Sequence, residues 1–253
     1  MQEHSTSVLK SPEFPNIIGL IAELNEHSAF GQFLHLWESI IYALIVIALL
    51  TFFAFHASRN RKLLPSGLQN AAEFLVSFVD DFVCSVLGPK GRKYTPFIGT
   101  LFLYILALNS IGLIPFFKSP TIELSATFAL ALVVFFYTIF IALTELGPLG
   151  FLDHLMGQPR GIMAMTLIMP IFMFVVEVIS FLVRPISLSL RLRSNIFGDD
   201  TILALFASQG INGFLWLLPN FLLVVITSVI QAAVFSILTL VYFSLAMKHE
   251  DGH

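Results

Sequence analysis

The sequence predicts an all-α membrane protein with about five membrane-embedded helices and one interfacial amphipathic helix. Three observations lead to this fold class: 57% of the 253 residues are hydrophobic, only 11% are charged, and the mean hydropathy is +0.89. Soluble domains carry about 25% charged residues. A water-soluble globule cannot cover so many apolar side chains, whereas a lipid bilayer accommodates them.

Charge and cysteine content exclude several function classes. The formal net charge is −3 at pH 7, and no basic patch with interleaved aromatic residues occurs, so no nucleic-acid partner is expected. The single cysteine, Cys84, excludes an intramolecular disulfide framework and a cysteine-based metal cluster. We expect no metal and no cofactor, and we expect a lipid bilayer as the immediate surroundings.

Long apolar runs predict where the helices lie. Residues 1–33 form a predicted polar arm with a short amphipathic helix around Ile17 to Leu24, and residues 34–253 form a single predicted transmembrane domain. Each apolar run has at least the roughly 20 residues that cross a bilayer. The last two runs exceed that length, so we expect two tilted helices that form a hairpin. The predicted spans are 34–57, 94–117, 122–143, 162–206 and 214–247.

The segment 66–87 has a different pattern from the spans. Its apolar residues recur at helical spacing, and Glu73, Ser77, Asp80 and Asp81 fall between them. This pattern is typical of an amphipathic helix that lies at the membrane interface. We expect Asp80 and Asp81 to face water.

The distribution of lysine and arginine predicts the orientation of the chain in the membrane. With five crossings, eight basic residues fall on one side, two fall on the other, and three lie inside the predicted spans. Because the more basic side faces the cytoplasm, we expect an external N-terminus and a cytoplasmic C-terminus. The basic residues on the cytoplasmic side are Arg59, Arg61, Lys62, Lys90, Arg92, Lys93, Arg160 and Lys248.

Charged side chains inside the span 162–206 are the most informative residues of the chain. A charge at the bilayer centre costs about 2.5 to 3.5 kcal/mol on insertion scales, so each one needs a partner, a water-filled cavity or a functional reason. At about 100° per residue, one face of this helix carries a polar stripe that extends roughly 30 Å. The stripe consists of Glu177, Ser180, Arg184, Ser187, Arg191, Asn195 and Asp199. Arg193 and Asp200 lie on the opposite face, where they are placed to neutralise each other.

The last span, 214–247, carries a fainter polar stripe, which consists of Thr227, Ser228, Gln231 and Tyr242. Glu123 and Ser125 open the span 122–143, and Asn109 lies in the span before it. Such side chains are expected to line aqueous half-pathways across the membrane rather than a dry core. The sequence therefore predicts an ion pathway, with the proton as the expected ion.

Several of these residues also have purely structural interpretations. Serine and threonine in membrane helices commonly hydrogen-bond to the preceding turn of their own helix. This alternative applies to Ser180, Ser187 and Thr227. Glu177 and Arg184 are candidates for an ordinary stabilising ion pair, and Asn195 and Gln231 are candidates for hydrogen bonds that hold two helices together. Arg191 resists such an interpretation because arginine keeps its proton in proteins.

Five stretches of the chain resemble one known family. The strongest is Arg184 to Asp200, in which a proline and Ser-Leu precede Arg191 and an asparagine follows it, and the second is Gln231 to Ala246. Weaker matches are Pro65 to Asn70, Gly88 to Tyr94 and Asn109 to Pro115. All five occur in the family's order. Together they resemble subunit a of the Fo sector of F-type ATP synthases, over most of the chain beyond residue 34.

This resemblance implies a role for each matching residue. Arg191 falls on the family's essential arginine, the charge barrier of the proton pathway, and Gln231 falls on the glutamine that faces it. Polar positions on the route to the cytoplasmic side are matched by Glu177 and Ser180. Polar positions of the opposite access channel are matched by Asn195, Asp200 and Glu123. A tyrosine of the last helix is matched by Tyr242.

The resemblance also implies partners and a location. Subunit a lies beside a rotating ring of c subunits, so the predicted hairpin is expected to lie against this c-ring. The b-subunit peripheral stalk and the rest of the ATP synthase are further expected partners. The role is non-catalytic, and the expected location is a bacterial cell inner membrane, with an organellar inner membrane as the alternative. The proton is the default coupling ion, and sodium specificity is set largely on the ring.

The chain departs from the family pattern in two places. Arg193 and Ser194 stand where many members have Phe-Gly. Val224 stands where some bacterial members carry a histidine, which often partners the acid at the position of Asp200. We therefore hypothesise that Asp199, which lies on the polar stripe, takes over proton relay.

Two other function classes remain as alternatives. A secondary transporter or ion channel with an intramembrane arginine site is expected to show internal repeats and helices broken near the membrane midplane, and the sequence shows no such repeat. A membrane anchor for another complex leaves the polar stripe unexplained.

Overall fold

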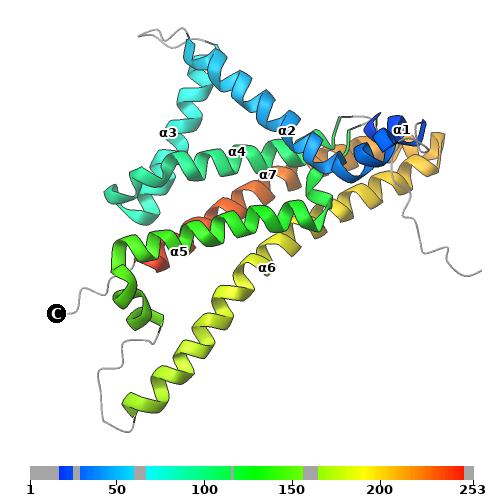
Figure 1. The fold of residues 1–253 in the computed structure, drawn as a ribbon. Helices are drawn as coiled ribbons and strands as arrows, with labels where there is room; N and C mark the ends of the chain where they lie inside the picture. Colours follow the sequence, from blue (N-terminus) through cyan, green and yellow to red (C-terminus); the bar gives the residue numbers. More distant parts are fainter. Residues whose placement is uncertain (1–16, 25–28, 60–66, 115–116, 156–164, 248–253) are drawn as a thin grey trace, which may run out of the picture. The chain divides into compact units, whose positions relative to one another are not determined.

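Helices account for most of the described chain. In the computed structural model, the described residues are 17–24, 29–59, 67–114, 117–155 and 165–247. Their α-helices, in chain order in Figure 1, are α1 (Ile17–Leu24), α2 (Ala29–Arg59), α3 (Leu68–Leu87), α4 (Thr95–Ile111), α5 (Leu124–Leu155), α6 (Met165–Ser208) and α7 (Ile211–Met247). Two short 3-10 helices are η1 (Pro89–Tyr94) and η2 (Pro120–Ile122).

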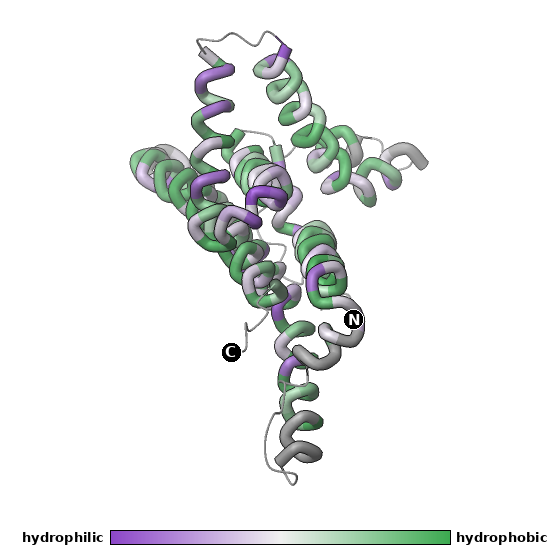
Figure 2. The backbone as a smooth tube through the Cα atoms, turned by 90° about the vertical axis from the view of Figure 1, so that its left-hand side faces the viewer, coloured by the Kyte–Doolittle hydropathy of each residue, from purple (hydrophilic) through white to green (hydrophobic). Residues whose placement is uncertain are grey.

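The predicted fold class is confirmed for the described residues. All of their regular secondary structure is helical, and five helical stretches are long and apolar enough to cross a membrane. Figure 2 shows that hydrophobic residues predominate along the long helices. The five candidate spans are Leu36–Arg59, Pro89–Ile111, Leu124–Pro148, Ile171–Phe206 and Leu218–Met247.

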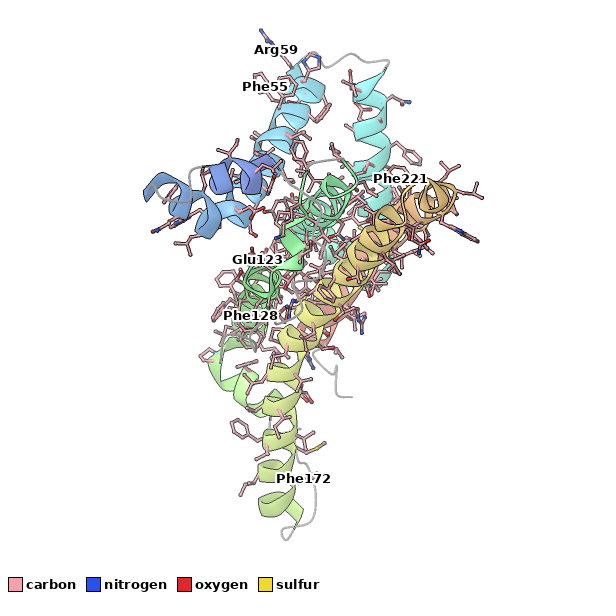
Figure 3. The ribbon with its side chains drawn as sticks, turned by 90° about the vertical axis from the view of Figure 1, so that its right-hand side faces the viewer. Phe55, Arg59, Glu123, Phe128, Phe172 and Phe221 are labelled. Atoms are coloured by element: carbon pink, nitrogen blue, oxygen red, sulfur yellow. The ribbon has the colours of Figure 1, made fainter. Side chains whose placement is uncertain are left out.

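Large apolar side chains on these helices are exposed. The phenyl rings of Phe55 on α2 and Phe172 on α6 are 62% and 61% exposed, and those of Phe128 on α5 and Phe221 on α7 are exposed as well (Figure 3). In water, contiguous surfaces of this kind lead to aggregation. In a bilayer, the same rings contact acyl chains that are as apolar as they are. The exposure is therefore what a membrane protein requires.

The last two helices are long. The helix α6 has 44 residues and α7 has 37. At about 1.5 Å per residue, α6 is roughly 66 Å long, more than twice the roughly 30 Å of a bilayer's hydrocarbon core. A helix of this length fits a membrane by tilting or by extending beyond the hydrocarbon. The helix α6 also continues without a break through Pro185.

The chain divides into two compact units, and each draws on segments that are far apart in the sequence. The first unit contains Met1–Arg61, Phe102–Ala126 and Leu192–Ala233. The second unit contains Lys62–Leu101, Thr127–Arg191 and Val234–His253. Parts of α4, α6 and α7 therefore belong to each unit.

The second unit has a core that attaches the amphipathic helix to the spans. Its buried residues are Val79, Val83, Tyr94, Ile98, Ile141, Leu240 and Phe243. Aromatic rings add to this core, because Phe97 and Tyr137 stack at 4.3 Å between ring centroids. Only Val79 and Val83 of α3 are fully buried, whereas Phe74 on the same helix is 73% exposed. The predicted amphipathic helix thus presents a narrow apolar edge to the core and a broad surface to its surroundings.

Ion pairs reinforce the attachment of α3. The Arg92 guanidinium lies 2.8 Å from Asp80 Oδ2, and Thr95 Oγ1 donates to Asp80 Oδ1 at 2.8 Å. These two partners hold the pKa of Asp80 below its usual range, with the Thr95 hydrogen bond as the larger cause. Asp80 is half-buried, so its side chain is partly exposed while it is bound by these two partners. Asp81 is exposed, as expected.

The helix α5 continues beyond the predicted span 122–143. Gly147 has a positive φ of 71°, a conformation that glycine adopts without a steric penalty, and the helix breaks there. Pro148 follows at the start of the next helical turn, where its missing N–H costs no hydrogen bond. The segment after Gly147, which lies beyond the end of the predicted span, is helical as far as Leu155.

Candidate functional site

Two hydrogen bonds join α6 to α7 within the first unit. Asn195 Nδ2 donates to Gln231 Oε1 at 2.6 Å, and Thr227 Oγ1 donates to Asp199 Oδ2 at 2.8 Å. On each helix the two residues are four positions apart, so they lie on one face about one turn from each other. The polar stripes of the two predicted spans thus meet through these two hydrogen bonds, which we call the cross-helix rungs.

Each rung has one buried residue, Asp199 or Gln231, whereas Thr227 is half-buried and Asn195 is exposed. Asp199 is 9% exposed and Gln231 is 3% exposed. A buried carboxyl group without a hydrogen-bond partner is costly, and Thr227 supplies that partner. Within the described residues, Gln231 Nε2 and the adjacent Ser228 Oγ are buried without a partner of their own. The rungs therefore leave hydrogen-bonding capacity on α7 for a group that is not among the described residues.

Thr227 makes the hydrogen bond to its own helix that is its structural interpretation, and it also makes a hydrogen bond to α6. Its Oγ1 lies 3.0 Å from the carbonyl oxygen of Val224, one turn earlier on α7. The same atom lies 2.8 Å from Asp199. Back-bonding and a cross-helix contact therefore occur together.

A second polar group of the first unit surrounds η2. Ser119 Oγ donates to the carbonyl of Leu108 at 2.8 Å and lies 2.7 Å from Thr121 Oγ1, which donates to Asn109 Oδ1 at 3.1 Å. Arg193 Nε donates to the Ile122 carbonyl at 3.1 Å. The predicted neutralisation of Arg193 by Asp200 is not tested, because the Asp200 side chain lies outside the described part.

Glu123 follows η2 directly and is half-buried. Its Oε2 lies 3.5 Å from Ser125 Oγ, so the two residues predicted to open this span do face each other.

Sequence reasoning missed one buried acid of the first unit, Glu38. This residue lies on α2 and is 6% exposed, one turn before Tyr42, which is 1% exposed. The signal was present, because Glu38 is a carboxylate within the first long apolar run. It was the same signal that singled out Glu177.

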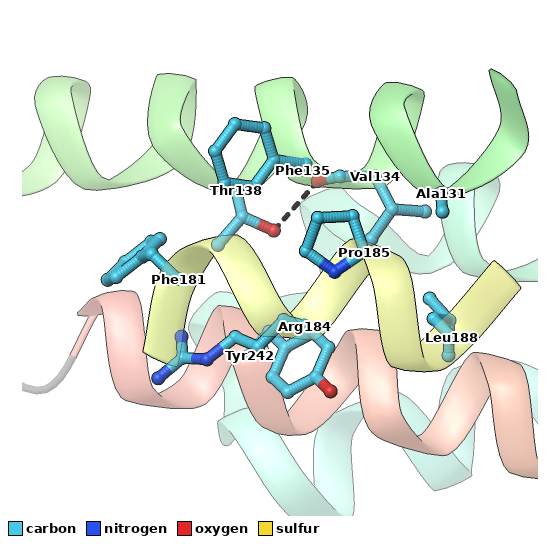
Figure 4. A pocket seen from close by; sticks show the side chains of 9 residues that line it. All are labelled: Ala131, Val134, Phe135, Thr138, Phe181, Arg184, Pro185, Leu188 and Tyr242. Atoms are coloured by element: carbon cyan, nitrogen blue, oxygen red, sulfur yellow. Dashed lines mark hydrogen bonds between the residues drawn. The ribbon is translucent and has the colours of Figure 1, made fainter. Parts of the chain in front are cut away.

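In the second unit, the polar stripe of α6 is built around Arg184. Its Nη2 lies 3.3 Å from Glu177 Oε1. The guanidinium also lies over the ring of Phe181, at 4.5 Å from the centroid, and over the ring of Tyr242 on α7, at 5.1 Å. Figure 4 shows Arg184 and Tyr242 together at one side of a small pocket between α5, α6 and α7. Ser180, between Glu177 and Arg184 in sequence, is half-buried.

Arg191 is the last residue of α6 that belongs to the second unit. It is exposed, and no hydrogen bond or ion pair joins it to another described residue of that unit. A permanent cation within a candidate span is therefore available to an acidic partner outside this unit.

Comparisons with known proteins identify relatives over most of the chain. A family model described as "ATP synthase A chain" matches residues 40–244. A protein named "ATP synthase subunit a" from Protochlamydia amoebophila is 39% identical over 250 residues, which cover 95% of this chain and 91% of the relative. "ATP synthase subunit a 3" from Pelobacter propionicus is 38% identical, over 85% of this chain and 89% of the relative. "ATP synthase subunit a" from Helicobacter pylori is 35% identical, over 84% of this chain and 90% of the relative.

Proposed function

The chain belongs to the ATP synthase A chain family, and from this premise we propose that it is the proton-translocating stator subunit of the Fo sector. The family match over residues 40–244 carries this proposal. The subunit is non-catalytic: it moves protons, and the catalytic chemistry belongs to other subunits of the complex. It provides two offset half-channels and an arginine barrier that protonate and deprotonate carboxylates on a rotating c-ring.

The access half-channel is assigned to the polar residues of α6 and α7 in the first unit. It consists of Asn195, Asp199, Asp200, Gln231 and Glu123. The two cross-helix rungs support this assignment, because they place an acid and an amide at hydrogen-bond distance from partners inside an apolar hairpin. A proton entering here neutralises a ring carboxylate, and the neutral acid then tolerates contact with lipid.

The exit route is assigned to the polar residues of the second unit: Glu177, Ser180 and Tyr242. The support is the Arg184 cluster, in which Glu177 and Tyr242 lie on two sides of one guanidinium. A route lined by charged groups holds water more readily than the apolar surface around it.

Arg191 is the barrier between the two half-channels. Its fixed positive charge stabilises the ionised form of a ring carboxylate that comes near it, so the carboxylate releases its proton there. The same charge repels protons and blocks a direct leak between the half-channels. Each proton that moves through 100 mV releases about 2.3 kcal/mol, which drives rotation.

The surroundings follow from the same proposal. Residues 34–253 act as one transmembrane domain of a bacterial inner membrane protein, with an external N-terminus and a cytoplasmic C-terminus. The long helices α6 and α7 form a tilted hairpin against the c-ring, and the b-subunit peripheral stalk is the second neighbour. The lengths of α6 and α7 support this arrangement, because they exceed what a perpendicular crossing needs.

The experiment that tests the proposal is ATP-driven proton pumping in inverted membrane vesicles with Arg191→Ala. We expect pumping to be lost while the complex still assembles and co-purifies with the c-ring. The matched control is Arg193→Ala, which removes an arginine from the same helix that donates to a backbone carbonyl. It is expected to keep pumping. Normal pumping by Arg191→Ala would remove both the arginine barrier and the half-channel assignment.

A further inference from the structure

The hydroxyl of Thr227 lies between two acceptors. One is the side-chain oxygen Asp199 Oδ2 at 2.8 Å, and the other is the backbone carbonyl oxygen of Val224 at 3.0 Å. A hydroxyl has one proton to donate and two lone pairs that accept. Thr227 therefore donates to only one of these oxygens at a time. It donates to Asp199 when that carboxylate is ionised, and it is free to donate to the Val224 carbonyl when Asp199 carries a proton.

The direction of the Thr227 hydrogen bond depends on the protonation state of Asp199, because the observed partner of Asp199 is neutral. Among the described residues, Asp199 has no hydrogen bond or ion pair with a charged side chain. The part of α7 that faces it, up to Ala233, contains no ionisable side chain. Apart from tyrosines, the other ionisable side chains described in this unit are Glu38, His56, Arg59, Lys118, Glu123 and Arg193. Asp199 is thus a largely buried acid whose observed partner is neutral.

We propose that Thr227 is a positioning residue that satisfies Asp199 in both of its protonation states and so allows Asp199 to take up and release protons reversibly. The inference rests on the proposed function, because it assigns a device to the access half-channel.

Asp199 can gain and lose a proton with Thr227 and the Val224 carbonyl as the protein groups that take part. When Asp199 is ionised, Thr227 donates its proton to Asp199 Oδ2. When a hydronium ion of the pathway gives up its proton and becomes water, an O–H bond forms at Oδ2, and the new acid donates to Thr227 Oγ1. The Thr227 proton then turns to the Val224 carbonyl, and Thr227 keeps its own proton throughout. Neither state leaves a buried polar atom of this group unpaired, so neither carries the penalty of a lost hydrogen bond.

The test is the pH profile of passive proton conduction through the intact membrane sector, in vesicles from which the catalytic head has been removed. Thr227→Val removes the hydroxyl and keeps the shape of the side chain. It removes a hydrogen bond that the ionised carboxylate accepts, so Asp199 gives up its proton less readily. Thr227→Val also removes the hydrogen bond of the protonated acid, but a hydrogen bond to a charged group is the stronger of the two, so the profile is expected to move to higher pH by about one unit.

Two further variants separate this role from simple packing. Thr227→Ser keeps a hydroxyl and is expected to restore most of the wild-type profile. Thr201→Val is the matched control, because Thr201 Oγ1 donates to the Phe197 carbonyl of its own helix at 2.7 Å and is exposed. It is expected to leave the profile unchanged. If Thr227→Val fails to assemble, Thr227→Ala removes the same hydroxyl with less bulk and takes its place.

Infrared spectroscopy of the assembled complex reports on Asp199 directly. The band of the protonated carboxyl group, identified by its loss in Asp199→Asn, is expected to persist to higher pH in Thr227→Val than in wild type. An unshifted profile or band in Thr227→Val, or an equal shift in Thr201→Val, would overturn the inference. If Arg191→Ala abolishes pumping while Thr227→Val behaves as wild type, only the inference about Thr227 falls. Normal pumping by Arg191→Ala removes the proposed function itself.

Discussion

The two units of the molecule bind their acidic side chains in different ways. In the first unit, the buried Asp199 accepts a hydrogen bond from a neutral hydroxyl, and an amide pair forms the neighbouring rung. In the second unit, Glu177 lies beside the guanidinium of Arg184, and Asp80 lies beside that of Arg92. The observed partner of Asp199 is neutral, whereas Glu177 and Asp80 each have a permanently charged partner, to which Asp80 adds the hydroxyl of Thr95.

This difference separates groups that are suited to exchange protons from groups that hold structure. An acid whose partner is a hydroxyl has a satisfied neutral form and a satisfied ionised form. An acid whose partner is a guanidinium has a full charge beside it at every pH at which proteins fold. The first arrangement suits a relay, and the second suits a fixed element at the edge of a pathway or a clamp between helices.

The largest effect is expected at Asp199, where one substitution tests whether the difference between the two units matters for proton pumping. Asp199→Asn removes the only ionisable group of the Asp199–Thr227 rung while keeping a hydrogen-bond acceptor for Thr227. Loss of a positioned proton-transfer group typically costs about 100-fold or more, and we expect ATP-driven pumping to fall by that order. Asp200→Asn is the adjacent control. If Asp199→Asn pumped normally and Asp200→Asn did not, relay would belong to Asp200 and the contrast between the units would lose its functional meaning.

A smaller effect is expected at Arg184, where a substitution tests whether the charged partner of Glu177 stabilises the second unit. Arg184→Gln removes the cation beside Glu177 and both ring contacts. Exposed cation–π contacts and ion pairs contribute about 0.5–1 kcal/mol each, discounted for partial exposure, so the free energy of unfolding is expected to fall by about 1–2 kcal/mol. The temperature at which the purified complex loses pumping then falls by a few degrees, while pumping at low temperature falls less than in Asp199→Asn.

Arg184→Lys is the matched variant for this prediction. It keeps the charge beside Glu177 but loses the flat guanidinium that stacks on Phe181 and Tyr242. Its inactivation temperature is expected to lie between those of wild type and Arg184→Gln. A glutamine variant as heat-stable as wild type would mean that the cluster does not hold the unit together.

The smallest effect is expected at Asp80, where the paired acid serves only to attach α3. The pKa of Asp80 is lowered in the folded chain, so its contribution to stability is present at neutral pH and is lost as the pH falls through the folded-state value. Asp80→Asn is therefore expected to increase amide hydrogen exchange in residues 68–87 at pH 7. Once the pH lies below the lowered folded-state pKa of Asp80, the variant and wild type should exchange alike, because the wild-type carboxyl is then neutral as well. A difference that persisted at low pH would point to packing rather than charge.

The spans were predictable because their signal is local. A run of about 20 apolar residues defines a crossing without reference to anything else in the chain, and the same holds for the helical spacing of α3. The charges inside the span 162–206 identified Arg191 and its neighbours in the same way. The partners of these polar residues were not predictable in general, because the partners come from segments that are distant in the sequence.

Particular residues show where local reasoning stops. The partner of Asp80 was not predicted, because Arg92 is twelve positions away and η1 turns the chain back toward Asp80. Arg193 donates to a carbonyl 71 positions earlier, a contact that the helical wheel of a single span does not show. The helix after Gly147 was missed because a Gly-Pro pair marks a break without showing whether a new helix follows.

The short distance between Thr227 Oγ1 and Asp199 Oδ2 has a consequence for selectivity. Two oxygens at 2.8 Å are already in direct hydrogen-bond contact, with space between them for a proton and for nothing larger. A metal cation would have to push the two oxygens, and with them α6 and α7 within this unit, apart before both could coordinate it. In the proposed relay, this rung therefore discriminates by size as well as by charge, and it suits the one cation that has no electron shell of its own.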